Sequence, residues 1–330
     1  MNDMLAKYFD TALQPLAEPV QRLAYTGSQQ MDTLVLGRKP VILTGALESW
    51  PAFTTWNPQY FRERWGDRSL PAHETKWEGQ VPYLSLNAEK ATKKTLSEFV
   101  EGASGPDYDL YVHQLEAAKS FPGSDADLTF GDLIEQAPGA TALKPNVWMG
   151  TPGTRSGLHF DSADNLIAMF YGGKAFMLVD PSAPKQLYPF HHCPTKSQID
   201  PAKIDWARFP QLRQAKIYLD VLRPGELLFL PYGWWHYFTA LELTINANCW
   251  FYWKSVSYPG QTALLSPYLR YLRRCGPSYV LHFFYQLLWY GMLGRPHQRH
   301  ALSPPPHGAR IWAIMVRNLK RLTTHAAHKA

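Results

Sequence analysis

Cysteine is scarce in this sequence, and long hydrophobic runs, low-complexity tracts and blocks of like charge are absent. The 330 residues include three cysteines, Cys193, Cys249 and Cys275, which are far apart and lack CxxC spacing. Neither a disulfide framework nor a zinc knuckle is therefore indicated, and a reducing, cytoplasmic setting is expected. Residues 1–15 contain acidic side chains and no apolar core, so we expect no secretory signal.

The longest apolar stretch, Tyr279 to Leu293, is interrupted by His282 and Gln286. It is shorter than the roughly 20 residues that span a bilayer, which favours a buried or interface helix. The net charge of +6 is spread along the chain and indicates ordinary solubility more than a nucleic-acid surface. The sequence contains no P-loop, no G-x-G-x-x-G and no evident Ser/His/Asp nucleophile.

The sequence is rich in aromatic residues and in short apolar segments that resemble strands. Its 12 Trp and 18 Tyr suit a large β core and an aromatic-lined pocket. Short apolar runs separated by Gly and Pro are typical of a β-sandwich or barrel. These runs are 41–44, 110–114, 227–230 and 243–251, together with 165–171 and 174–179, which Gly172-Gly173 joins in a predicted β-hairpin.

Helices are expected on both sides of this β region. Residues 1–37 form a predicted N-terminal helical segment, and Asn57-Pro58 caps a helix that carries Phe61 and Trp65 and stops at Gly66. Residues 38–256 then form the β domain, and 257–330 a helical region with helices near 261–274, 278–293 and 309–324. The apolar surface of that region either binds a partner or packs on the chain's own barrel.

A candidate metal site begins with His159-Phe160-Asp161, whose i, i+2 spacing points both side chains to one face of a strand. His236 follows a Pro-Tyr-Gly turn and could join them. Two imidazoles and a carboxylate leave coordination positions open, as a ferrous oxygenase requires. The HxD spacing alone is also that of a surface hydrogen-bonded pair. Lys174 would need an anion if it were buried, although its spacing alone favours an exposed turn lysine.

Longer motifs decide between these readings. They are GLHFDSADNLIAMFYGGKAFMLVDP, LYPF, KSQID, RPGELLFLPYGWWHYF and NANCWF, preceded by KPVILTGALESWPAF. Over about residues 38–253 the chain resembles the JmjC or cupin-like (Cupin_8) family of Fe(II)- and 2-oxoglutarate-dependent oxygenases. Within that family it is most similar to the asparaginyl hydroxylase type that modifies hypoxia-inducible factor. The resemblance implies a mainly β fold with α additions, built on a double-stranded β-helix (jelly-roll) core.

The resemblance also implies roles for individual residues. His159, Asp161 and His236 match the metal-binding triad, and Lys174 matches the lysine that pairs with the distal carboxylate of 2-oxoglutarate. The other matched positions surround the co-substrate and the metal: Tyr111, Ser156 (where the family usually has Thr), Asn165, Asn248 and Trp250.

The expected activity is hydroxylation of a C–H bond with consumption of O₂ and 2-oxoglutarate and release of succinate and CO₂. A peptide or protein side chain is the first choice of substrate, whereas tRNA, a free amino acid or another small metabolite stays open. A non-catalytic cupin that binds a metal or ligand is the alternative of another class, and Lys174 argues against it. Because C-terminal helices mediate homodimerisation in this family, a homodimer is also expected.

Overall fold

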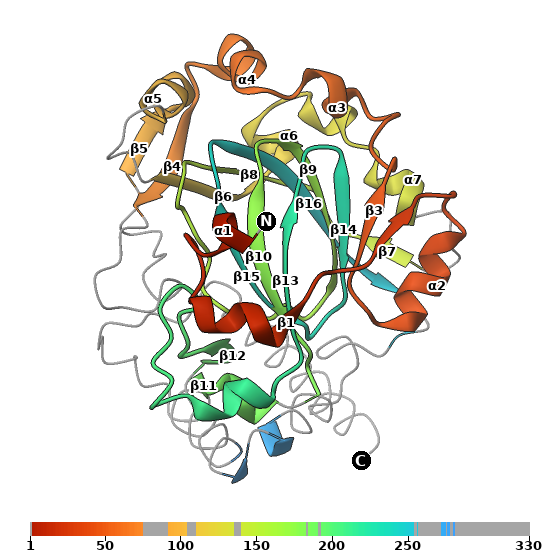
Figure 1. Cartoon of the computed structure of the whole chain (residues 1–330). Helices are drawn as coiled ribbons and strands as arrows, with labels where there is room; N and C mark the ends of the chain where they lie inside the picture. Colours follow the sequence, from red (N-terminus) through yellow and green to blue (C-terminus); the bar gives the residue numbers. More distant parts are fainter. Residues whose placement is uncertain are drawn as a thin grey trace, which may run out of the picture.

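The computed structural model describes residues 2–74, 92–103, 110–134, 140–182, 184–190 and 193–253, and a few positions between 256 and 280. Two β-sheets dominate it (Figure 1). The larger sheet has the order β2-β3-β14-β9-β16-β8-β6-β4-β5, with β7 also paired to β16. Its strands are β2 (Arg22–Ala24), β3 (Val41–Thr44), β4 (Ser69–Glu74), β5 (Thr92–Thr95), β6 (Leu110–Glu116), β7 (Ala140–Ala142), β8 (Asn146–Gly150), β9 (Asp164–Tyr171), β14 (Glu226–Leu230) and β16 (Thr244–Trp253).

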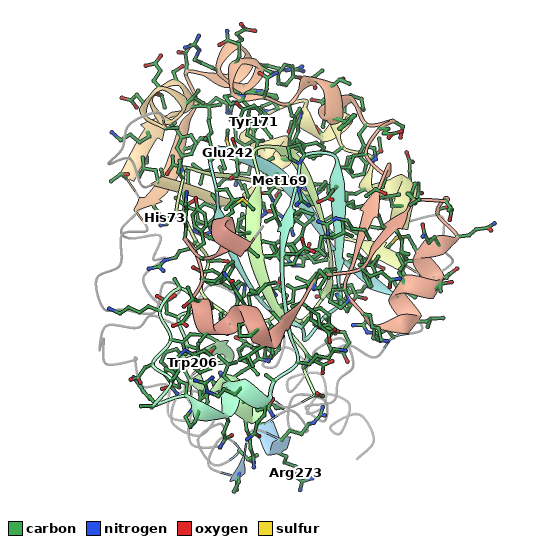
Figure 2. All side chains as sticks on the ribbon, in the orientation of Figure 1. His73, Met169, Tyr171, Trp206, Glu242 and Arg273 are labelled. Carbon is green, nitrogen blue, oxygen red and sulfur yellow. The ribbon has the colours of Figure 1, made fainter. Side chains whose placement is uncertain are left out.

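The smaller sheet has the order β1-β13-β10-β15. Its strands are β1 (Ala17–Glu18), β10 (Lys174–Val179), β13 (Ile217–Leu222) and β15 (Trp235–Ala240). Between the sheets, Ile167 and Met169 of β9 pack with Phe176 and Leu178 of β10 in one apolar cluster; Met169 is labelled in Figure 2. Two packed sheets with these connections confirm the expected mainly β, jelly-roll fold.

The predicted hairpin at Gly172-Gly173 is wrong. β9 pairs with β14 and β16 in the larger sheet, whereas β10 pairs with β13 and β15 in the smaller sheet. The turn thus carries the chain from one sheet to the other. Gly172 has φ +67°, and a Cβ there would collide with the Leu243 carbonyl. A two-glycine turn permits this close crossing as readily as it permits a hairpin.

Helices cover the outer side of the larger sheet (Figure 1). They are α2 (Gln30–Gly37), α3 (Pro51–Thr55), α4 (Pro58–Trp65), α5 (Leu96–Gly102), α6 (Ala117–Ser120), η4 (Ser124–Asp127) and α7 (Phe130–Ile134). The predicted helix after Asn57 is confirmed as α4, and the Asn57 side chain accepts a hydrogen bond from the Tyr60 amide at 2.9 Å.

The N-terminal segment 1–37 is less helical than expected. Besides α1 (Asn2–Leu5), η1 (Thr11–Leu16) and α2 it contains β1 and β2, which extend the two sheets by parallel pairing with β13 and β3. The connection between β10 and β13 contains η5 (Pro184–Leu187), β11 (Pro189–Phe190), β12 (Cys193–Ser197) and η6 (Pro210–Gln214). Trp206 of this connection, labelled in Figure 2, donates to Asp10 at 3.2 Å.

The predicted helices near 261–274, 278–293 and 309–324 lie, apart from a few positions, outside the described residues. Within the described part of the chain, no helix combines the length and apolar character needed to cross a membrane.

Candidate metal and co-substrate site

Backbone pairing brings the two histidines of the triad side by side. The His159 amide donates to the His236 carbonyl at 3.1 Å, and the His236 amide donates back at 2.6 Å. The turn before β15 joins the third residue to them, because the Gly233 amide donates to the Asp161 carbonyl at 3.0 Å. Two segments separated by 75 residues in sequence thus meet at one place.

The side chains of this triad could hold one metal ion. One ligand atom from each of His159, Asp161 and His236 lies within 4.8 Å of the other two. The Nε2 atoms of His159 and His236 are 4.0 and 3.8 Å from the Asp161 carboxylate oxygens. A gap of this size accepts an ion at metal–ligand distances of about 2 Å.

Hydrogen bonds fix which nitrogen of each imidazole faces that gap. His159 Nδ1 lies 2.7 Å from the Gly157 carbonyl, and His236 Nδ1 lies 3.0 Å from the Trp234 carbonyl. Since a carbonyl only accepts, each Nδ1 carries the hydrogen and each Nε2 presents its lone pair toward Asp161. Burial, reinforced by neighbouring His236, lowers the pKa of His159 well below its usual range. The neutral imidazole that a metal requires is therefore the stable form.

Trp250 orients the carboxylate of the triad. Its Nε1–H donates to Asp161 Oδ2 at 2.8 Å, and Asp161 Oδ1 lies 4.0 Å from His159 Nε2. The predicted aromatic wall beside the metal is thus also a hydrogen-bond donor to a candidate ligand.

Lys174 lies deep between the sheets. It is buried, and its Nζ donates to Asn246 Oδ1 at 2.6 Å and lies 5.4 Å from the centroid of the Tyr111 ring. Leu178 pairs with His236 across β10 and β15, and Lys174 is four residues before Leu178 on the same face. The candidate metal ligands and Lys174 therefore lie on one inner face, and the space between the two sheets that these residues line is the chamber referred to below.

Strand β16 connects the two ends of that chamber. Asn246, Asn248 and Trp250 alternate on its inner face; the first binds Lys174 and the last binds Asp161. Between them, Asn248 donates to Asn165 Oδ1 at 2.8 Å and accepts from Trp148 Nε1 at 2.6 Å. From Asn246 to Trp250 the strand rises roughly 13 Å, at about 3.3 Å per residue.

Ser156 lies in the segment that leads to His159. Its hydroxyl oxygen accepts a hydrogen bond from the Phe238 amide at 3.3 Å, so the hydroxyl hydrogen can still donate to another group. The structure thus brings His159, Asp161, His236 and Trp250 together at one end and Lys174 with Tyr111 at the other, with Asn165 and Asn248 between them.

Sequence reasoning missed Asn246, Trp148 and the two carbonyls that orient the histidines. Asn246 had a readable signal, since it stands two residues before Asn248 in the same motif and must share its face. Trp148 belongs to a region without a distinctive motif.

Comparison with known proteins agrees with this geometry. Residues 28–256 match the family model described as a cupin-like domain. Relatives include lysine-specific demethylase 8 of Xenopus tropicalis, which is 30% identical over 66% of this chain and 49% of its own length. Lysine-specific demethylase JMJ30 of Arabidopsis thaliana is 29% identical over 64% of this chain and 49% of its own length. HSPB1-associated protein 1 of Bos taurus is 32% identical over 68% of this chain and 51% of its own length.

The chain belongs to the cupin-like, JmjC-type family of Fe(II)- and 2-oxoglutarate-dependent oxygenases. The cofactor set is accordingly Fe(II) with 2-oxoglutarate as co-substrate and O₂ as oxidant, and the His-Asp-His group is the candidate iron site. The chain spans about half the length of these curated relatives.

Proposed function

We propose that this protein hydroxylates a C–H bond of a peptide or protein side chain, with His159, Asp161 and His236 as the iron ligands. The observation that carries the proposal is the single chamber with the His-Asp-His group at one end and the buried Lys174 at the other. A cupin that only held a metal would not need the second feature.

The position of each residue in the site indicates its role. Lys174, with Asn246 and Tyr111 around it, binds the distal carboxylate of 2-oxoglutarate. Trp250 keeps the Asp161 carboxylate in its orientation, and the Gly157 and Trp234 carbonyls hold the protons on Nδ1 of the two histidines. Bound iron supplies the activation of O₂, coupled to the decarboxylation of 2-oxoglutarate to succinate and CO₂. The protein supplies the orientation of the reacting groups.

A protein substrate is supported by the names of two relatives, a lysine-specific demethylase and an HSPB1-associated protein. The same chemistry has two outcomes. Hydroxylation of a carbon next to carbon gives a stable alcohol, whereas hydroxylation of an N-methyl group gives a hemiaminal that loses formaldehyde. We favour the stable alcohol, because the motifs resemble those of an asparaginyl hydroxylase. A tRNA or a free amino acid is the alternative substrate.

Turnover of defined pools tests the substrate class. The protein, loaded with Fe(II), 2-oxoglutarate and ascorbate, is incubated with separate pools of peptides, tRNA and amino acids under isotopically labelled O₂. We expect peptide products that gain one labelled oxygen atom. Labelled products in the tRNA or amino-acid pool alone, or formaldehyde in place of a stable mass gain, would contradict the proposal.

We also propose that residues 257–330 mediate homodimerisation, as the family resemblance implies. Light scattering at micromolar concentration should give twice the 37.7 kDa chain mass. A single-chain mass would contradict this.

A further inference from the structure

The turn between β14 and β15, residues 231–234, contacts two of the three candidate iron ligands. The Gly233 amide donates to the Asp161 carbonyl at 3.0 Å, and the Trp234 carbonyl lies 3.0 Å from His236 Nδ1. Asp161 lies outside the strands, so its backbone depends on contacts of this kind. Because one short turn holds both ligands, its position helps to set the distance between them.

A buried carboxylate that is not one of the candidate ligands anchors this turn. Asp164 is fully buried, and its Oδ1 accepts a hydrogen bond from the Tyr232 amide at 2.8 Å. The same carboxylate pairs with the Arg38 guanidinium, at 2.9 Å between Nη1 and Oδ2 and 2.8 Å between Nη2 and Oδ1. Asp164 therefore connects a cation to the turn.

Arg38 makes two further contacts with the same turn. Its guanidinium lies 4.5 Å from the centroid of the Tyr232 ring, and its carbonyl accepts a hydrogen bond from Trp234 Nε1 at 3.0 Å. Arg38 ends α2 in the left-handed conformation, with φ +52°, which residues other than glycine rarely adopt. One arginine thus holds the turn at both Tyr232 and Trp234.

The chemistry of this ion pair makes it a firm anchor. A buried carboxylate is costly unless it is paired and hydrogen-bonded. The two-point contact with Arg38 also fixes the orientation of the Asp164 carboxylate. A displacement of the turn would take the Tyr232 amide away from a buried negative charge, and the pair therefore opposes that displacement.

We propose that Asp164 and Arg38 are positioning residues of the iron site, which act through the 231–234 turn to set the placement of Asp161 and His236. The inference rests on the proposed iron ligands and adds the two side chains that hold them in register. Loss of such a supporting contact lowers metal affinity by about 10- to 100-fold.

Two double variants that leave no charge without a partner test the anchor. Arg38→Met/Asp164→Asn keeps an acceptor for the Tyr232 amide, whereas Arg38→Met/Asp164→Leu removes it at a similar side-chain volume. Anaerobic titration measures the Fe(II) affinity, and urea unfolding of the metal-free protein measures stability. The Leu variant should bind Fe(II) about 10- to 100-fold more weakly than wild type. The Asn variant should recover most of that loss.

A second arginine–aspartate pair provides the matched control. Arg22 donates to Asp220 at 2.8 Å; this arginine side chain is 30% exposed and its aspartate 1%, against 28% and 0% for Arg38 and Asp164. Asp220 likewise accepts from a backbone amide, that of Val20, at 3.1 Å. It lies on β13, which β10 separates from β15. Arg22→Met/Asp220→Asn and Arg22→Met/Asp220→Leu should lose stability in urea and keep the wild-type Fe(II) affinity.

The donor side of the bond gives an independent pair of variants, which decides the question if the Leu variant does not fold. The Trp234 amide donates to the Pro231 carbonyl at 3.3 Å, Tyr232 has a negative φ and Gly233 has φ +82°, so the turn is of type II. Proline is favoured at the second position of such a turn. Tyr232→Pro therefore keeps the turn and removes the N–H that binds Asp164, whereas Tyr232→Ala removes only the ring. Tyr232→Pro should bind Fe(II) about tenfold more weakly than Tyr232→Ala.

The outcomes separate this inference from the proposed function. Equal Fe(II) affinities within both pairs of variants, or an equal loss of affinity in the Arg22 and Asp220 control, would overturn the positioning role. If wild type binds one Fe(II) while the variants do not differ, only the positioning role fails. If wild type binds no Fe(II), the proposed iron site fails together with it.

Discussion

At the scale of single residues, the environment of Lys174 links burial to ligand binding. Burial lowers its pKa from 10.5 to about 7, because an ammonium loses solvation between the sheets. A dianionic co-substrate restores the charged form. Binding of 2-oxoglutarate above pH 7 must therefore be accompanied by uptake of a proton at this side chain.

The affinity of the wild-type protein for 2-oxoglutarate should weaken about tenfold per pH unit above pH 7. Lys174→Met should bind 2-oxoglutarate weakly at every pH, without that slope, and still bind metal.

The stability of the free protein should depend on the same side chain. The folded free protein releases the Lys174 proton near pH 7, while the unfolded chain holds it to about pH 10.5. The free energy of unfolding should therefore rise with pH across that window in wild type relative to Lys174→Met. Calorimetry and denaturant titrations from pH 6 to 10 measure both, and parallel pH profiles for the two proteins would contradict the assignment.

Trp250 allows a test of carboxylate orientation. Trp250→Phe removes the donor to Asp161 Oδ2 and keeps an aromatic ring. Loss of such a supporting hydrogen bond weakens metal affinity by about 10- to 100-fold. The control is Trp253→Phe, a buried position on the opposite face of the same strand. Titration with Fe(II) under anaerobic conditions measures the affinity, and equal affinities in the two variants would refute the proposed orienting role.

At the scale of elements, the turn between β9 and β10 determines where Lys174 enters the chamber. Gly172→Ala should destabilise the fold through both its positive φ and the collision with the Leu243 carbonyl. Gly153→Ala is the matched control, because Gly153 has φ +82° and open space around its Cβ position. The positive φ alone costs about 1 kcal/mol, so Gly172→Ala should lose more than Gly153→Ala in urea unfolding. Equal losses would mean that the crossing is less tight than described.

At the same scale, helices and strands were predicted correctly where neighbouring residues alone specify them. The Asn57-Pro58 start of α4 and the strand predicted at 110–114, observed as Leu110–Glu116, needed only neighbouring residues. The partner of a strand is a non-local property, and for that reason β9 and β10 were wrongly paired through their Gly-Gly turn. The segment 1–37 was predicted as helical, yet β1 and β2 form because two sheet edges accept them.

For the candidate site, the family motifs named the residues before their geometry was known, and their roles stay predictions. His159, Asp161 and His236 meet as the motif spacing indicated. Trp148 and the partner of Asn246 escaped, since both contacts depend on side chains that approach from other strands. The face of Asn246 is readable from Asn248 two residues later, but its hydrogen bond with Lys174 is not.

At the scale of the whole molecule, the two sheets together hold the candidate metal ligands at one place and the co-substrate lysine, Lys174, at another. The smaller sheet contributes Lys174 and His236, and the larger sheet contributes the β16 row that holds Lys174 at one end and Asp161 at the other. Lys174 and His236 lie on paired strands of the smaller sheet, whereas Asp161 lies outside a strand and is held by the hydrogen bond from Trp250 of β16. The distance between the candidate metal ligands and Lys174 thus limits the length of the co-substrate that fits.

Succinate formation from 2-oxoglutarate is the most direct test of the central claim. Purified protein with Fe(II), ascorbate and 2-oxoglutarate, without added substrate, should form succinate slowly. His159→Ala and Asp161→Ala should abolish it, while circular dichroism and thermal melting confirm that both variants are folded. Equal rates in wild type and both folded variants would contradict the account.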